Sequence, residues 1–138
     1  MAINYTEKGY GLHLAVAAAG HWLRRINTVW TSDNDSAVQA IINSYDPLPY
    51  SKQTANDEIK ATALEKIQTI FPAIPDIDTV NLIAEIWQSL VSQAKSPTTN
   101  MQTVISIYTA AKGGIQSVNA ATDQAGIDSA VAAITWPI

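Results

Sequence analysis

Cysteine is absent from this 138-residue chain, and charged residues make up only 14% of it. Without cysteine the chain has no disulfide, no thiolate nucleophile and no cysteine-based zinc site. An average soluble domain carries about 25% charged residues, so we expect an unusually neutral surface, as suits a protein that works inside an assembly. The net charge of −4 argues against a nucleic-acid partner, because binding to phosphates requires a basic patch.

Long apolar runs are also missing. The most apolar early stretch, Leu12–Ala19, has eight residues, whereas a transmembrane helix needs about 20. The first residues offer neither the basic leader nor the cleavage context of a signal peptide. We therefore expect neither a membrane span nor a targeting segment.

The residue patterns of common catalytic and metal sites are not found either. There is no Gly-x-Ser-x-Gly turn, and Lys112-Gly113-Gly114 has the wrong order for a phosphate-binding loop. His13 and His21 lack further ligands at metal-binding spacing, and Asp33–Asp35 lacks the glycine and glutamate of a calcium loop. The sequence predicts no catalytic residue, no metal site and no cofactor, and therefore not an enzyme.

The chain divides at Asp46-Pro47-Leu48-Pro49, because two closely spaced prolines disfavour helix and favour an extended connection. We predict a small N-terminal subdomain over residues 1–45, a proline-rich connection over 46–51 and a helical domain over 52–138. The predicted fold class is mainly α, a bundle of about four helices with a small N-terminal α+β subdomain that contains one β-hairpin.

The N-terminal subdomain is predicted to hold a helix, a hairpin and a second helix. Tyr10–Ala19 is apolar all round, which predicts a buried helix, and Gly20 is placed to end it. Residues 20–31 are rich in aromatic and β-branched side chains, which predicts the hairpin. The second helix contains Ala37–Ile42 and ends near Tyr45.

Helical periodicity predicts four helices in the second part: Ser51–Phe71, Asp78–Lys95, one from Thr98 through Gly113-Gly114, and Asp123–Ile134. The third is predicted to pass through the two glycines because its apolar stripe does not change phase. Asp78 and Thr122 are the predicted N-caps, and Leu82 is placed to close a hydrophobic staple with Ile77. The apolar stripes predict one core made by Ile59, Ile67, Phe71, Ile83, Trp87, Ile105 and Tyr108.

The tryptophans are the most informative side chains. Trp22 and Trp30 lie on short elements, and we interpret them first as core of the N-terminal subdomain and alternatively as interface anchors. For the terminal Trp136 both interpretations stay open. Because tryptophan and tyrosine dominate binding hot spots, the candidate partner-binding residues are Tyr5, Tyr10, Trp22, Trp30 and Trp136.

A series of short strings extends over almost the whole chain: Gly20–Leu23, Val29–Asp33, Ala37–Asn43, Asp46–Pro49, Ile70–Ile74, Asn119–Thr122 and Ile134–Pro137. Taken together, these strings resemble small proteins encoded beside tail-fibre genes in tailed bacteriophages and prophages. None of them is a chemical motif, so the specificity of the resemblance comes from their order and number. No binding residue is transferred from it.

The resemblance implies a tail accessory protein, either an assembly chaperone of the tail fibre or a small virion component at the fibre or baseplate. Its location would be the virion, or the host cytoplasm during assembly. The implied partner is the tail-fibre protein, with the baseplate as a second one, and self-association stays open. The alternatives are another virion protein, such as a capsid decoration or neck protein, and a prophage-encoded regulator or enzyme, which the missing catalytic residues disfavour.

We expect residues 1–45 to be the main attachment point. This segment carries two of the tryptophans and a hairpin edge, yet so short a segment rarely buries enough surface to be stable alone. The alternative anchor is the terminal Trp136-Pro137-Ile138.

Replacement of Trp87 by alanine should lower the free energy of unfolding by about 3–5 kcal/mol, because a large core side chain is lost. Denaturant unfolding measures this change. A loss under about 1 kcal/mol would place Trp87 on a surface instead.

Overall fold

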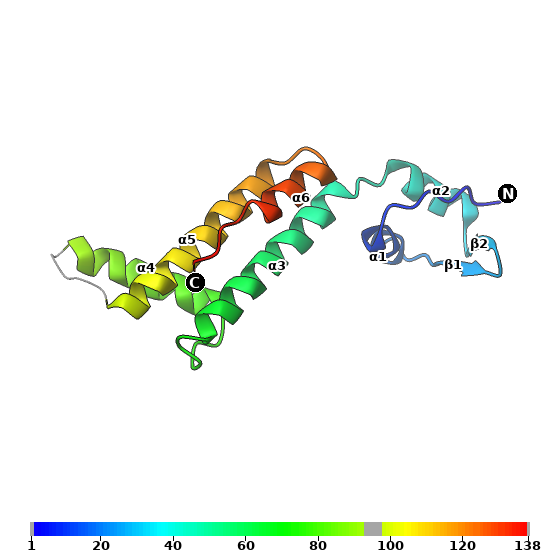
Figure 1. Cartoon of the computed structure of the whole chain (residues 1–138). Coiled ribbons are helices and arrows are strands. Elements are labelled where there is room, and N and C mark those ends of the chain that lie inside the picture. The colour runs from blue at the N-terminus through cyan, green and yellow to red at the C-terminus, as the bar shows by residue number, and fades with distance from the viewer. Residues whose placement is uncertain (1, 93–97, 138) are drawn as a thin grey trace. The chain divides into compact units, whose positions relative to one another are not determined.

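The computed structural model describes residues 2–92 and 98–137, with residues 86–92 described by their backbone alone. The chain forms two compact units, an N-terminal unit over residues 1–50 and a C-terminal unit over residues 51–138. Both are drawn in Figure 1. The fold is mainly α-helical with one antiparallel two-stranded sheet near the N-terminus, as the sequence predicts.

The N-terminal unit contains α1 (Tyr10–Ala18), β1 (Leu23–Ile26), β2 (Val29–Ser32) and α2 (Asp35–Ser44). The strands form the predicted hairpin, which turns at the two residues between them. The first turn residue, Asn27, has a φ of 56°, a left-handed conformation that asparagine tolerates better than most residues.

Local hydrogen bonds explain where the two helices of this unit end or begin. Gly20 has a φ of 81° and donates its N–H to Ala17 O at 3.0 Å, while His21 donates to Val16 O at 3.1 Å. These two bonds are a Schellman motif, so Gly20 ends α1 as predicted. At the start of α2 the side chain of Asn34 accepts the N–H of Ala37 at 3.1 Å.

The core of the N-terminal unit is the contact between α1 and α2. Leu12 and Val16 of α1 and Val38 and Ile42 of α2 are all at most 1% exposed. The prediction that α1 is buried on all sides is wrong, because Tyr10 on its other side is 65% exposed. A unit of this size has too few elements to cover both sides of a helix.

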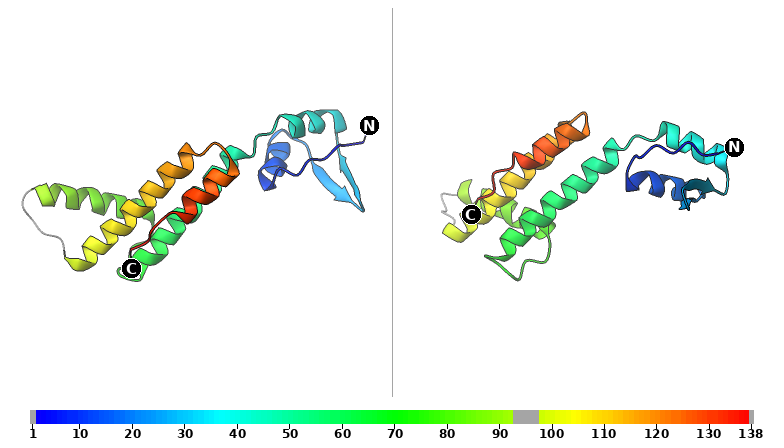
Figure 2. Two further views of the ribbon diagram at one scale, coloured as in Figure 1. Left: turned by 45° about the horizontal axis from the view of Figure 1, so that its top comes forward. Right: turned by 45° about the vertical axis from the view of Figure 1, so that its right-hand side comes forward.

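The C-terminal unit is built from α3 (Leu48–Gln68), α4 (Ile77–Ser92), α5 (Thr99–Ala120) and α6 (Gln124–Ala132). Helices α5 and α6 form an antiparallel pair with α3 beside them, as Figures 1 and 2 show from three directions. Helix α3 starts at Leu48, inside the stretch predicted to be an extended connection. Proline is tolerated in the first turn of a helix, where N–H groups have no partner inside the helix.

Two predicted N-caps are wrong by one or two residues. Asp76, not Asp78, accepts the N–H of Thr79 at 2.7 Å and its hydroxyl at 2.8 Å, and these hydrogen bonds hold the pKa of Asp76 below its usual value. The predicted staple is also wrong, because Leu82 is 57% exposed. At α6 the cap is Asp123, whose side chain accepts the N–H of Gly126 at 2.7 Å, in place of Thr122.

The core of the C-terminal unit differs in part from the predicted one. Ile59 and Ile67 of α3 are buried, whereas four predicted core residues are only half-buried: Phe71, Ile83, Ile105 and Tyr108. In α5 the buried face contains Val104, Ile107, Ala111, Gly114 and Val118. The side chain of Trp87 lies outside the described residues, so its burial stays a prediction.

Helix α5 continues through Gly113 and Gly114, as predicted. The two glycines have different surroundings. A Cβ atom on Gly114 would overlap Ile134 Cδ1 and lie 2.7 Å from Ile134 Cγ1, whereas one on Gly113 would meet nothing within 4 Å. Gly114 is therefore a core residue, because the segment after α6 reaches the backbone of α5 there.

Gly113→Ala should raise the free energy of unfolding by about 1 kcal/mol through helix propensity alone. Gly114→Ala should lose that gain, because Ile134 must move, and overpacking costs about 1–3 kcal/mol. Thermal and denaturant unfolding of the two variants compare them directly. Equal stabilisation by both would contradict the close approach of Ile134.

Candidate functional site

Large exposed apolar side chains gather in the N-terminal unit. Of the six such side chains in the described residues, five lie there and only Leu82 lies in the C-terminal unit. The five are Tyr10, Leu14, Trp22, Ile26 and Val29, with exposed fractions between 42% and 65%. Exposed apolar side chains that lie on one face of an element are candidates for an interaction site.

Part of this surface is one face of α1. Tyr10, Leu14 and Ala17 are exposed and follow one another at helical spacing, so they share a face. Leu12 and Val16 point to the opposite side, into the core. Helix α1 thus has a second apolar face, which the rest of the N-terminal unit leaves largely exposed.

The rest of the surface is the outer face of the hairpin. The strands pair Leu23 with Ser32, Arg24 with Thr31, Arg25 with Trp30 and Ile26 with Val29. Directly paired residues project to the same side, and successive residues alternate. Leu23 and Trp30 therefore share the inner face, while Ile26 and Val29 share the outer one with Arg24. By the same alternation Trp22, just before β1, also belongs to the outer face.

An aromatic cluster covers the inner face. The ring of Tyr5 stacks on that of Trp30, with centroids 3.8 Å apart and planes at 14°. The Tyr5 hydroxyl lies 3.2 Å from Glu7 Oε2 and 3.3 Å from His13 Nε2. A phenol has one hydrogen, which goes to the carboxylate, so His13 can complete the cluster by donating from Nε2. Burial, and then the charge of Glu7, raises the pKa of Tyr5.

Polar contacts attach the first residues of the chain to α2. The ammonium group of Lys8 donates to Ile42 O and Tyr45 O, both at 2.8 Å, and so satisfies carbonyl groups at the end of the helix. The side chain of Gln39 accepts the Asn4 N–H at 2.7 Å and donates to Asn4 O at 3.1 Å. The segment that carries Tyr5 is therefore held along its length.

Trp22 is fixed at its backbone while its ring stays 42% exposed. Asp33 accepts the Trp22 N–H at 2.9 Å and pairs with His21 Nδ1 at 2.8 Å. The hydrogen bond from His21, and then the one from Trp22, holds the pKa of Asp33 below its usual value. The guanidinium group of Arg24 lies over the Trp22 ring, 4.2 Å from its centroid.

The structure separates the five predicted binding residues into groups. Tyr5 and Trp30 lie together, half-buried, and Tyr10 and Trp22 are exposed elsewhere in the same unit. Trp136 belongs to the C-terminal unit, half-buried, with Lys66 Nζ 5.9 Å from its ring centroid.

The sequence interpretation missed three further exposed residues, Leu14, Ile26 and Val29. Strand alternation and helical spacing could have placed Ile26 with Trp22, and Leu14 with Tyr10.

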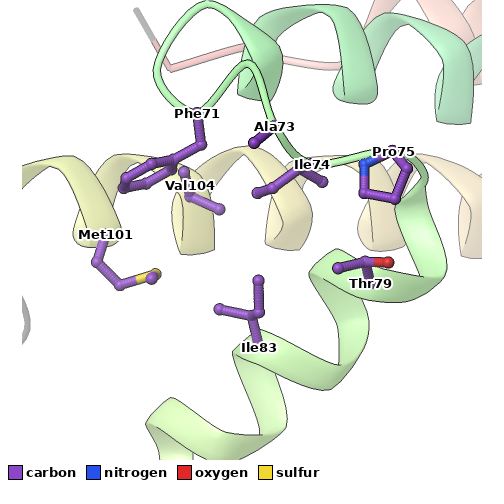
Figure 3. A pocket seen from close by; sticks show the side chains of 8 residues that line it. All are labelled: Phe71, Ala73, Ile74, Pro75, Thr79, Ile83, Met101 and Val104. Atoms are coloured by element: carbon purple, nitrogen blue, oxygen red, sulfur yellow. The ribbon is translucent and has the colours of Figure 1, made fainter.

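A separate apolar pocket of about 310 Å³ lies in the C-terminal unit. Figure 3 shows Phe71 from the loop after α3, Ile83 from α4 and Met101 from α5 around a shared space. The remaining lining residues are Ala73, Ile74, Pro75, Thr79 and Val104. Thr79 is the only polar residue among the eight that line the pocket, and its hydroxyl donates to Asp76. The lining is therefore apolar in character.

No group of three or more His, Cys, Asp or Glu side chains suitable for a metal ion occurs among the described residues. Within the same residues, no helix combines the length and apolarity that a membrane crossing requires. No known family model, curated protein or solved structure matches this chain.

Asp33→Asn should reduce the acid sensitivity of the hairpin. The lowered pKa means that the Asp33 carboxylate stabilises the folded unit above its unfolded pKa of about 3.9. This stabilisation is lost as the pH falls through the folded pKa, whereas the asparagine variant has none to lose. Urea unfolding at several pH values, followed by hairpin NMR signals, tests this, with Asp57→Asn as the control for loss of a charge. An unchanged pH dependence would contradict the role of Asp33.

Proposed function

We propose that this chain is a bacteriophage tail accessory protein that binds the tail fibre through its N-terminal unit. It acts there as an assembly chaperone or as a structural component between fibre and baseplate. The observation that carries the proposed mode of action is that five of the six large exposed apolar side chains of the described residues lie in this unit. The choice of partner rests on the sequence resemblance.

The chemistry of these side chains suits protein binding. Tyrosine and tryptophan offer large contact area with few rotatable bonds, and they dominate binding hot spots. The backbone of Tyr10 is ordered in a helix and that of Trp22 is bonded to Asp33, so no backbone entropy has to be lost at these positions when a partner covers them. The backbone that carries these two side chains is therefore already ordered before a partner binds.

The C-terminal unit serves as scaffold in this proposal. Among the described side chains of its helices the larger apolar ones are buried or half-buried, and only Leu82 is widely exposed. Trp136, the alternative anchor, is half-buried and lies near Lys66 of α3, which fits a structural role.

Capture of the tail-fibre protein of the same phage or prophage by the full chain tests the proposal. The double change Tyr10→Ser and Leu14→Ser should weaken capture at least about tenfold, because two exposed anchors are lost without a change to the core. Leu82→Ser is the matched control, since it removes a similarly exposed side chain from the other unit. Unchanged capture by the double variant, together with loss of capture by Trp136→Ala, would place the attachment at the C-terminal tail.

Mass spectrometry of purified particles separates the two forms of the proposal. A structural component stays in the particle at a fixed stoichiometry. A chaperone is found with free fibre protein in infected cells and is absent from finished particles.

A further inference from the structure

A two-stranded hairpin has two edges, and the strand pairing shows which backbone groups face outward along the β1 edge. Hydrogen-bonded and non-hydrogen-bonded pairs alternate along an antiparallel ladder, and the pair beside a two-residue turn is a bonded one. Ile26–Val29 and Arg24–Thr31 are therefore the bonded pairs. The Thr31 hydroxyl, which donates to Arg24 O at 3.3 Å, agrees with this assignment. The N–H and C=O groups of Leu23 and Arg25 consequently point away from β2.

These outward groups are unpaired. No backbone hydrogen bond joins Leu23 or Arg25 to a segment outside the hairpin within residues 2–92 and 98–137. Strand β1 is also the more exposed of the two, because Arg24, Arg25 and Ile26 are exposed whereas three of the four residues of β2 are half-buried. An unpaired, exposed edge is a template for a further strand.

The side chains beside this edge have a distinct chemistry. Trp22, Arg24 and Ile26 follow one another at every second position on the outer face, and Arg24 lies over the Trp22 ring at 4.2 Å. Stacking orients a guanidinium group and leaves its N–H donors free for a carboxylate. Among the described residues no carboxylate lies within ion-pair distance of Arg24 or Arg25.

We propose that β1 accepts an extended segment of a protein partner as a third strand, with an acidic residue opposite Arg24 and apolar residues two positions away on either side. The apolar residues then lie beside Trp22 and Ile26, and the partner's backbone pairs with the outward groups of Leu23 and Arg25. Cross-strand neighbours of opposite charge and of matching apolar character stabilise a sheet. The inference rests on the proposed function only for the identity of the partner as the tail fibre.

A protein segment fits this edge better than a nucleic acid. Arg24 and Arg25 are the only arginines of the chain, and apolar side chains flank Arg24 on the outer face. Residues 1–45 carry three cations and three carboxylates, so the surrounding unit offers no basic patch.

The first test uses synthetic peptides and NMR on the full chain. The probe peptide has threonine at every second position. The positions between the threonines hold valine, glutamate and valine in that order, so glutamate is central. The control peptide has lysine in place of glutamate. The glutamate peptide should slow amide exchange at Leu23 and Arg25, which are unpaired in the free protein, and should bind about tenfold more tightly than the control. Arg24→Glu should reverse this preference.

The second test removes the outward donor. Arg25→Pro deletes an N–H that the hairpin does not use, and proline is tolerated at such edge positions. Arg25→Thr is the matched control, because it also removes the charge but keeps the N–H. Arg25→Pro should abolish peptide binding and fibre capture while the Arg24–Thr31 pairing persists in NMR spectra, and Arg25→Thr should retain most of both.

The outcomes separate this inference from the proposed function. If no peptide protects the amides of Leu23 and Arg25, strand addition is wrong, and the arginines merely guard the edge against aggregation. If the proline variant captures the fibre as well as the unchanged chain does, strand addition fails while the proposed function stands. If the unchanged chain captures no fibre but the glutamate peptide protects both amides, only the choice of partner fails. Protection of the same amides by concentrated protein alone would assign the edge to a second copy and overturn the acidic partner.

Discussion

The N-terminal unit depends on one small contact, the packing of α1 against α2 through Leu12, Val16, Val38 and Ile42. These four side chains are at most 1% exposed, and Tyr5 and Leu23 add to the cluster from its margin. Burial of a large aliphatic side chain contributes about 1.5–3 kcal/mol, so four of them can hold two short helices together. They cannot cover the far side of α1 as well. The apolar surface that faces solvent is thus a direct result of how little this unit can bury.

The side chains that fill the interior differ between the two units. In the C-terminal unit small residues are buried beside larger aliphatic ones, among them Ala63 of α3 and Ala111 and Gly114 of α5. Ile134 fits against Gly114 near Ile59. The N-terminal unit instead relies on a stacked aromatic pair, Tyr5 and Trp30, and on polar contacts to the end of a helix. A buried aliphatic interior suits a scaffold, and an exposed aromatic surface suits binding.

Most elements could be predicted from the sequence, because periodicity and end signals are local. Gly20 correctly predicts the end of α1. The unbroken apolar stripe of α5 correctly predicts that this helix continues through Gly113, although glycine has a low helix propensity. Errors arose where the deciding contact is distant or where two residues are chemically equivalent. Asp76 and Asp78 can both cap a helix, and only backbone geometry chooses Asp76. A search for stripes of large apolar residues cannot predict that Gly114 is buried, because its burial depends on Ile134 from another segment.

The same limit applies to the candidate site. Aromatic content indicated the N-terminal unit, but the contact between Tyr5 and Trp30 joins residues far apart in the chain, and no local pattern reveals it. The exposure of Tyr10 depends on what the remainder of the unit fails to cover. Leu14, Ile26 and Val29 were missed because aliphatic residues on short elements are usually core. Which side of such an element is free follows only from the arrangement of its neighbours.

The bonds of Lys8 impose an order on the folding of a chain that is still being synthesised. Its ammonium group bonds to carbonyl oxygens at Ile42 and Tyr45, more than thirty positions later. Until those residues leave the ribosome, the first segment has nothing to dock on, and both apolar sides of α1 are open to solvent. Domains fold largely in the order of their synthesis. A nascent chain therefore passes through an interval in which the apolar residues of α1 face solvent, and α2 later covers only one of the helix's two sides.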